Sequence, residues 1–179
     1  MRAFLGISIP EDLKKEIVAF QRRFSKFDIK FVEPENLHFN MKFFSEIGEE
    51  QISELKVLLE EVCKQFEPFE IEIKGVGAFP NPIYIRVLWL GVSNGRQELT
   101  GLAETIQESI KSIGFQPEKF TPHMTLGRVR TGREKDEIKR IMDSDDFLIG
   151  RMKVEEITLF QSKLTPSGPR YDKVFSVHL

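Results

Sequence analysis

The chain has 179 residues, and its 28 acidic and 26 basic side chains leave a net charge of −2. This balance argues against a protein that coats nucleic acid or lies on an anionic membrane, although a small basic pocket for one phosphate is compatible with it. The single cysteine, Cys63, excludes an internal disulfide and a cysteine-rich zinc site, and it fits a reducing compartment. No stretch approaches the roughly 18 apolar residues of a membrane span. From the lone cysteine we expect a protein of the reducing cytoplasm.

Strands and helices are predicted to alternate along the chain. Residues 3–9 predict a buried first strand, and Pro10 followed by two acids is typical of a helix start. Apolar residues at helical spacing carry that helix to Phe24. The segments that follow are, in order, strands 29–32 and 37–43, helix 49–66, strands 71–79 and 83–90, helix 99–113, strand 124–129, helix 134–142, and strands 154–161 and 171–178.

The pattern suggests an internal duplication, because each half supplies a strand, a helix and a strand that carries a histidine. The last two strands flank a turn, 165–169, and predict an antiparallel hairpin. No linker is long enough to separate independent domains. We therefore expect one α+β domain over residues 1–179, built from two similar lobes.

Two of the three histidines lie in similar surroundings, 85 residues apart. Side chains alternate along a strand, so His38, Asn40 and Lys42 share one face while residues 37, 39, 41 and 43 point into a core. His123 and Thr125 repeat this arrangement. If the two lobes are related by pseudo-symmetry, both histidine faces line one cleft.

Two imidazoles with hydroxyl or amide neighbours suit a displacement at phosphorus. One histidine can take a proton from water, while the other protonates the leaving oxygen. Thr125 and Asn40 can donate hydrogen bonds to phosphate oxygens, and Arg128 or Lys42 can add positive charge. These groups indicate phosphodiester hydrolysis.

The two motifs, His38-Phe39-Asn40-Met41 and His123-Met124-Thr125-Leu126, resemble the paired His-x-Thr-x motifs of the two-histidine (2H) phosphoesterases. The chain is most similar to the RNA 2′,3′-cyclic phosphodiesterases of that superfamily, also called 2′-5′ RNA ligases. The similarity runs nearly from end to end, through Arg2-Ala3-Phe4 and segments 31–38, 77–82, 122–128 and 162–171. It implies a bilobal α+β fold in which two antiparallel sheets surround a central cleft, with helices outside.

The resemblance also implies an activity and its residues. The activity is metal-independent hydrolysis of a terminal RNA 2′,3′-cyclic phosphate to a 2′-phosphate, without a cofactor, and ligation would be the reverse reaction. His38 would be the proton donor and His123 the proton acceptor, with Thr125 and Arg128 at the phosphate. Asn40 stands where the family usually has threonine; its amide can still donate to phosphate, but from a different position.

Several points stay open in the sequence. On a regular strand Arg128 points away from His123, so it reaches the cleft only if a bulge near Gly127 turns it; otherwise it is a surface charge. Lys42 is as easily a solvated lysine as a ligand, His178 has no assigned role, and Cys63 is expected to be a buried apolar residue. We expect a monomer that acts on RNA ends and not on membranes.

Two alternative functions compete with hydrolysis of a cyclic phosphate. An RNA-end-binding module results if Asn40 has weakened catalysis. A metal hydrolase lacks support, because neither a His-x-x-x-His motif nor a carboxylate cluster accompanies the histidines.

Overall fold

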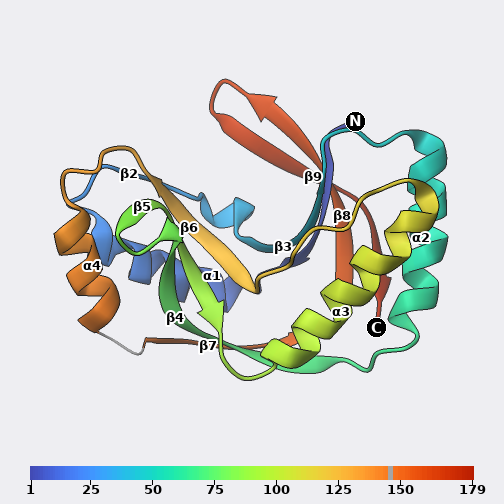
Figure 1. The fold of residues 1–179 in the computed structure, drawn as a ribbon, viewed down its shortest axis with the longest axis horizontal. Helices are drawn as coiled ribbons and strands as arrows, with labels where there is room; N and C mark the ends of the chain where they lie inside the picture. Colours follow the sequence, from blue (N-terminus) through green and yellow to red (C-terminus); the bar gives the residue numbers. More distant parts are fainter. Residues whose placement is uncertain (145–146) are drawn as a thin grey trace.

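The computed structural model describes residues 1–144 and 147–179, which form two antiparallel sheets flanked by helices (Figure 1). The first sheet has the strand order β3-β1-β8-β9, and the second has the order β2-β6-β5-β4-β7. The strands of the first sheet are β1 (Ala3–Ser8), β3 (His38–Phe44), β8 (Glu156–Thr165) and β9 (Gly168–His178). Those of the second are β2 (Ile29–Phe31), β4 (Phe69–Asn81), β5 (Tyr84–Val92), β6 (His123–Val129) and β7 (Leu148–Val154).

Helices cover the outer sides of the two sheets. They are α1 (Glu11–Gln21), α2 (Glu49–Cys63), α3 (Arg96–Ser109) and α4 (Lys135–Ser144), with short 3₁₀ turns η1 (Arg22–Phe24), η2 (Pro34–Asn36) and η3 (Ile110–Ile113). Helix α1 follows a strand of the first sheet but packs against β7 of the second, where Gly150 leaves room for the Leu13 side chain. Helix α2 packs against β9 of the first sheet and also against α3 (Figure 1).

The buried side chains form one cluster that includes residues of both sheets and of all four helices named above. The chain also crosses between the sheets several times, since β1 and β3 belong to the first and β2 to the second. Each sheet is therefore assembled from separate stretches of the chain. Among the described residues, no helix combines the length and the apolar character needed to cross a membrane.

The predicted α+β class, the two antiparallel sheets and the final hairpin are confirmed. The hairpin β8–β9 pairs from Glu156 opposite His178 to Thr165 opposite Gly168, and its far end projects beyond the rest of the first sheet (Figure 1). Cys63 is fully buried, as expected.

Several boundaries differ from the prediction. Strand β7 was not predicted. Gly150 and Arg151 interrupt the alternation of apolar residues that would indicate a strand, and the pairing of β7 with β4 shifts register at the same place. Its last residue, Val154, was wrongly assigned to the strand that follows. Helix α2 ends at Cys63, not at residue 66, since the next amides form tight turns back to Val62 and Cys63.

Other predicted ends are shifted by a few residues. The turn after β4 begins at Pro82, because β4 continues through Asn81. Helix α3 begins at Arg96 and its predicted last turn is the 3₁₀ turn η3, which ends at Gly114 in the left-handed conformation.

Candidate active site

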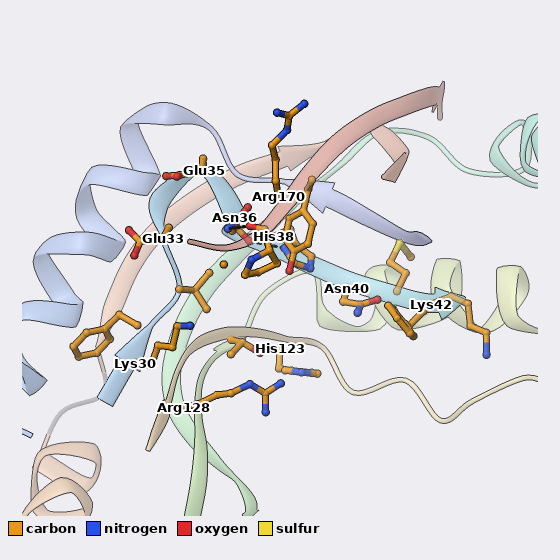
Figure 2. Close-up of a pocket in the computed structure, with 18 of the residues that line it drawn as sticks. Lys30, Glu33, Glu35, Asn36, His38, Asn40, Lys42, His123, Arg128 and Arg170 are labelled. Atoms are coloured by element: carbon orange, nitrogen blue, oxygen red, sulfur yellow. Dashed lines mark hydrogen bonds between the residues drawn. The ribbon is translucent and has the colours of Figure 1, made fainter. Parts of the chain in front are cut away.

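A cavity of about 1240 Å³ contains the five residues that the sequence analysis placed at a site. His38 and Asn40 enter it from β3 of the first sheet, and His123, Thr125 and Arg128 enter it from β6 of the second. Figure 2 shows the two histidines on strands of different sheets, and both line the same cavity. The structure thus brings together side chains that lie 85 residues apart in the sequence.

The far end of the β8–β9 hairpin forms a further wall of this cavity, with residues from Thr165 to Asp172. The hairpin is tied to the segment before β3, because the Asn36 amide donates a hydrogen bond to the Pro169 carbonyl oxygen at 2.9 Å. Tyr171 extends from the hairpin toward His38, with ring centroids 5.3 Å apart. No role was predicted for Tyr171, although it lies in one of the stretches that carried the family resemblance.

Both histidines are oriented by the same contact. The Nδ1 atom of His38 lies 2.6 Å from the carbonyl oxygen of Asn36, and the Nδ1 atom of His123 lies 2.6 Å from that of Thr121. A carbonyl oxygen only accepts, so each Nδ1 carries a proton and donates it. Each Nε2 atom is therefore left to exchange a proton with a ligand.

Aromatic rings pack against each imidazole. Phe4 lies 4.4 Å from the His38 ring centroid, and Phe79 lies 4.9 Å from that of His123. Trp89 stands 6.1 Å from His123, and its indole covers Gly77 so closely that any side chain at Gly77 would collide with it. The histidines are held by packing as well as by hydrogen bonds.

The pKa values of His38 and Tyr171 are shifted in opposite directions. Burial lowers the pKa of His38 from its ordinary value of 6.5, the hydrogen bond to Asn36 opposes the shift, and the charge of His123 lowers the pKa further. An anion bound between the rings would favour the protonated form of His38. Burial also raises the pKa of Tyr171, with Arg128 acting in the opposite direction, so the Tyr171 hydroxyl remains a hydrogen-bond donor.

A β-bulge explains how Arg128 reaches the cavity. Strand β6 pairs Thr125 with Trp89 and Gly127 with Leu88, so Leu126 is an extra residue on β6. The extra residue reverses the alternation, which places Arg128 on the cavity wall together with His123 and Thr125. A bulge near Gly127 was the condition under which Arg128 was expected to reach the cleft, and the structure contains it.

Strand β3 has an equivalent bulge that was not predicted. Leu5 pairs with Lys42 and Gly6 with Asn40, which leaves Met41 as the extra residue. The prediction that Phe43 faces the core was therefore wrong: Phe43 lines the cavity, and Phe44 is buried in its place. No feature of the sequence indicated this shift, because Met41, Phe43 and Phe44 are all apolar.

Lys42 also lines the cavity, but its charge is neutralised. Its ammonium donates to the carbonyl oxygen of Gln116 at 2.9 Å and forms an ion pair with Glu118 at 2.6 Å. With only 5% of its surface exposed, Lys42 joins β3 to the segment before β6. His178 is exposed near Glu156, away from the cavity.

Within residues 1–144 and 147–179, no three side chains of histidine, cysteine, aspartate or glutamate are grouped as a metal site requires. The cavity brings together the two histidines and Tyr171, and its lining also includes several cations and the acids Glu33, Glu35, Glu118 and Asp172. Such a set can exchange protons with a bound phosphate ester and balance its charge.

The family model described as "2'-5' RNA ligase superfamily" matches residues 9–165. A protein of Methanothermobacter thermautotrophicus named RNA 2',3'-cyclic phosphodiesterase is 39% identical over 96% of this chain and 95% of its own length. A protein of the same name from Methanocaldococcus jannaschii is 40% identical over 97% and 98% of the two chains. The crystal structure of a Thermus thermophilus protein, TT0787, superimposes with a TM-score of 0.83 at 25% identity, covering 100% of this chain and 98% of the other.

Proposed function

Given that the chain belongs to the 2'-5' RNA ligase superfamily, we propose that it hydrolyses RNA 2′,3′-cyclic phosphate ends to 2′-phosphomonoesters. The substrate class is that named for its relatives, which match this chain over nearly its full length. The observation that carries the proposal is the pair of histidines from opposing strands. Both line one cavity, and in each the Nδ1 atom lies 2.6 Å from a backbone carbonyl oxygen, so Nε2 is the nitrogen left to meet a ligand.

In the proposed reaction His123 is the proton acceptor and His38 is the proton donor. Nε2 of His123 takes a proton from a water molecule as its oxygen attacks phosphorus. The bond between phosphorus and the 3′ oxygen breaks, and Nε2 of His38 gives its proton to that oxygen. The products are a 2′-phosphate and a free 3′ hydroxyl, and the same displacement with a 5′ hydroxyl in place of water would form a 2′-5′ linkage.

The remaining residues stabilise the charge that grows on the phosphate. Asn40 and Thr125, each two residues beyond a histidine, donate to the two sides of the phosphate, and Arg128 supplies positive charge. Before substrate binds, burial lowers the pKa of His38 and favours its neutral form. The anionic phosphate then favours the protonated form, so the proton donor is charged when substrate is present.

The test is incubation of the purified protein with an oligoribonucleotide that ends in a 2′,3′-cyclic phosphate, in excess chelator. We expect a product with a 2′-phosphate, distinguished from the 3′-phosphate by its resistance to a 3′-specific phosphatase. Tight binding of the oligonucleotide without turnover would indicate an RNA-end-binding module instead. Turnover that disappears with chelator and returns with a divalent ion would contradict the two-histidine mechanism.

A further inference from the structure

Lys30 and Arg128 form a cross-strand pair of positive charges on the cavity side of the second sheet, and we call this pair the rung. Strand β2 pairs with β6 so that Lys30 is directly opposite Arg128, and both residues line the cavity. Side chains directly opposite on antiparallel strands share a face, and two like charges placed there destabilise the pairing. In the described part of the chain, neither side chain forms an ion pair with an acid.

The pair two residues away has the opposite arrangement. Just past the ends of β2 and β6, the Asp28 carbonyl oxygen accepts the Arg130 backbone N–H at 3.0 Å, and the two side chains form an ion pair at 3.6 Å. The sheet therefore pairs a cation with an acid outside the cavity and two cations inside it. Without a ligand this inner rung costs stability, whereas an anion bound across both side chains would turn it into a favourable site.

The acids of the cavity wall are engaged or directed elsewhere. Glu118 is paired with Lys42, and Asp172 with Lys163 and Arg170. Figure 2 shows Glu33 and Glu35 with their carboxylates turned away from Lys30 and the histidines. The positive charge of the rung is thus available to a ligand.

The position of the rung indicates which anion it binds. β2 is the edge strand of the second sheet, so Lys30 lies one strand further out than Arg128 and the histidine of β6. The reacting phosphate lies between the histidines, and a second phosphate of the same ligand reaches the edge strand only if the ligand continues beyond its terminal nucleotide. Resting on the proposed function, we propose that Lys30 binds the internucleotide phosphate that precedes the terminal cyclic phosphate, with Arg128 between that phosphate and the reacting one. The site would thereby favour oligonucleotide ends over mononucleotides.

The proposal is tested with Lys30→Gln, using an oligonucleotide and a mononucleotide that carry the same 2′,3′-cyclic end. We expect the ratio of kcat/KM for the oligonucleotide to that for the mononucleotide to fall by roughly 5- to 10-fold, the effect of losing one exposed charge-assisted contact. This fall should come from a higher KM for the oligonucleotide. The salt dependence of kcat/KM for the oligonucleotide should also become less steep, by about 0.7 in the logarithmic slope.

The matched control is Lys153→Gln, which removes an exposed lysine from β7, the opposite edge strand of the same sheet. An unchanged substrate ratio in Lys30→Gln, or an equal change in Lys153→Gln, would overturn the proposal. A wild-type protein without turnover would contradict the proposed function alone. The subsite would then be judged by whether Lys30→Gln weakens binding of a 2′-phosphorylated oligonucleotide more than binding of a nucleoside 2′-monophosphate.

Discussion

Gln21 and Gln107 make equivalent contacts with the two strands that carry the histidines, β6 and β3. From α1, the Gln21 amide donates to the carbonyl oxygen of Leu126 at 3.1 Å, and from α3, the Gln107 amide donates to that of Met41 at 2.8 Å. Leu126 and Met41 are the extra residues of the two β-bulges. A buried helix glutamine thus donates to the carbonyl group of each bulge residue, and at Leu126 it adds to the hydrogen bond from the Val32 backbone N–H at 2.9 Å.

We predict that Gln21 positions Arg128 through this bulge. Gln21→Met keeps the length of the side chain but removes hydrogen bonds to Leu126 and Val32. We expect a loss of about 1–3 kcal/mol in the free energy of unfolding, measured with denaturant, because this buried side chain loses two hydrogen bonds of about 0.5–1.5 kcal/mol each. We also expect kcat/KM to fall at temperatures where the variant is fully folded.

A double mutant separates positioning from stability. If Gln21 acts through Arg128, then Gln21→Met should lower kcat/KM little further in an Arg128→Ala background. Additive losses would show that Gln21 supports the fold only. Gln65→Met is the matched control, because this amide also binds a backbone carbonyl oxygen, that of Glu61, but on the exposed surface.

These bulges mark the limit of what the sequence could predict. The alternation in the histidine motifs correctly placed His38, Asn40, His123 and Thr125 on cavity-facing sides. One extra residue in each strand then reversed that alternation, and an apolar Met41 or Leu126 looks the same in a bulge as in a regular strand. The like-charged rung was missed for a related reason, since the pairing of Lys30 with Arg128 depends on a register between distant segments.

The second prediction concerns the roles of the two histidines. His38→Ala and His123→Ala should each lower kcat by ~10²–10⁴-fold, the usual contribution of a general acid or base. The double mutant should be little worse than either single mutant, because the two groups act in one step. A near-normal rate in a well-folded single mutant would make that histidine structural.

The pH dependence of activity distinguishes the proton donor from the acceptor. The profile of kcat/KM reports groups of the free enzyme, whereas that of kcat reports groups of the substrate complex. Burial lowers the pKa of His38 in the free protein, and the bound anion counteracts this. If His38 is the donor, the alkaline limb of the kcat profile should lie at higher pH than that of kcat/KM. Coincident alkaline limbs would contradict this assignment.

The third prediction is that the lowered pKa of His38 makes the fold sensitive to acid. A histidine whose pKa is lower in the folded state binds fewer protons there than in the unfolded chain, so unfolding takes up protons. The stabilising effect of neutral His38 is complete above its ordinary pKa of 6.5 and is lost as the pH falls from there through the lowered value. Denaturant unfolding across this range should show a weaker pH dependence in His38→Gln than in the wild type. His178→Gln, at an exposed position outside the cavity, is the control.

The last prediction concerns Asn40, where the first motif departs from the usual threonine. Its side chain lines the cavity two residues beyond His38, as Thr125 does beyond His123. An amide that donates to a phosphate oxygen as its charge grows stabilises the transition state more than the bound substrate, so its loss should lower kcat rather than raise KM. We expect Asn40→Ala to lower kcat by ~10²-fold, the lower end of the range for one such donor, because Thr125 and Arg128 remain.

Asn40→Thr restores a shorter hydroxyl donor and should keep or raise kcat relative to the wild type. The comparison is made at saturating cyclic-phosphate substrate, with melting curves to confirm that all three proteins are folded. Thr125→Ala provides the matched loss on the opposite strand and should give a decrease of similar size. Equal values of kcat for asparagine, alanine and threonine would mean that residue 40 makes no contact in the transition state. The first motif would then contribute His38 alone, and the charge on the phosphate would be stabilised from the second sheet.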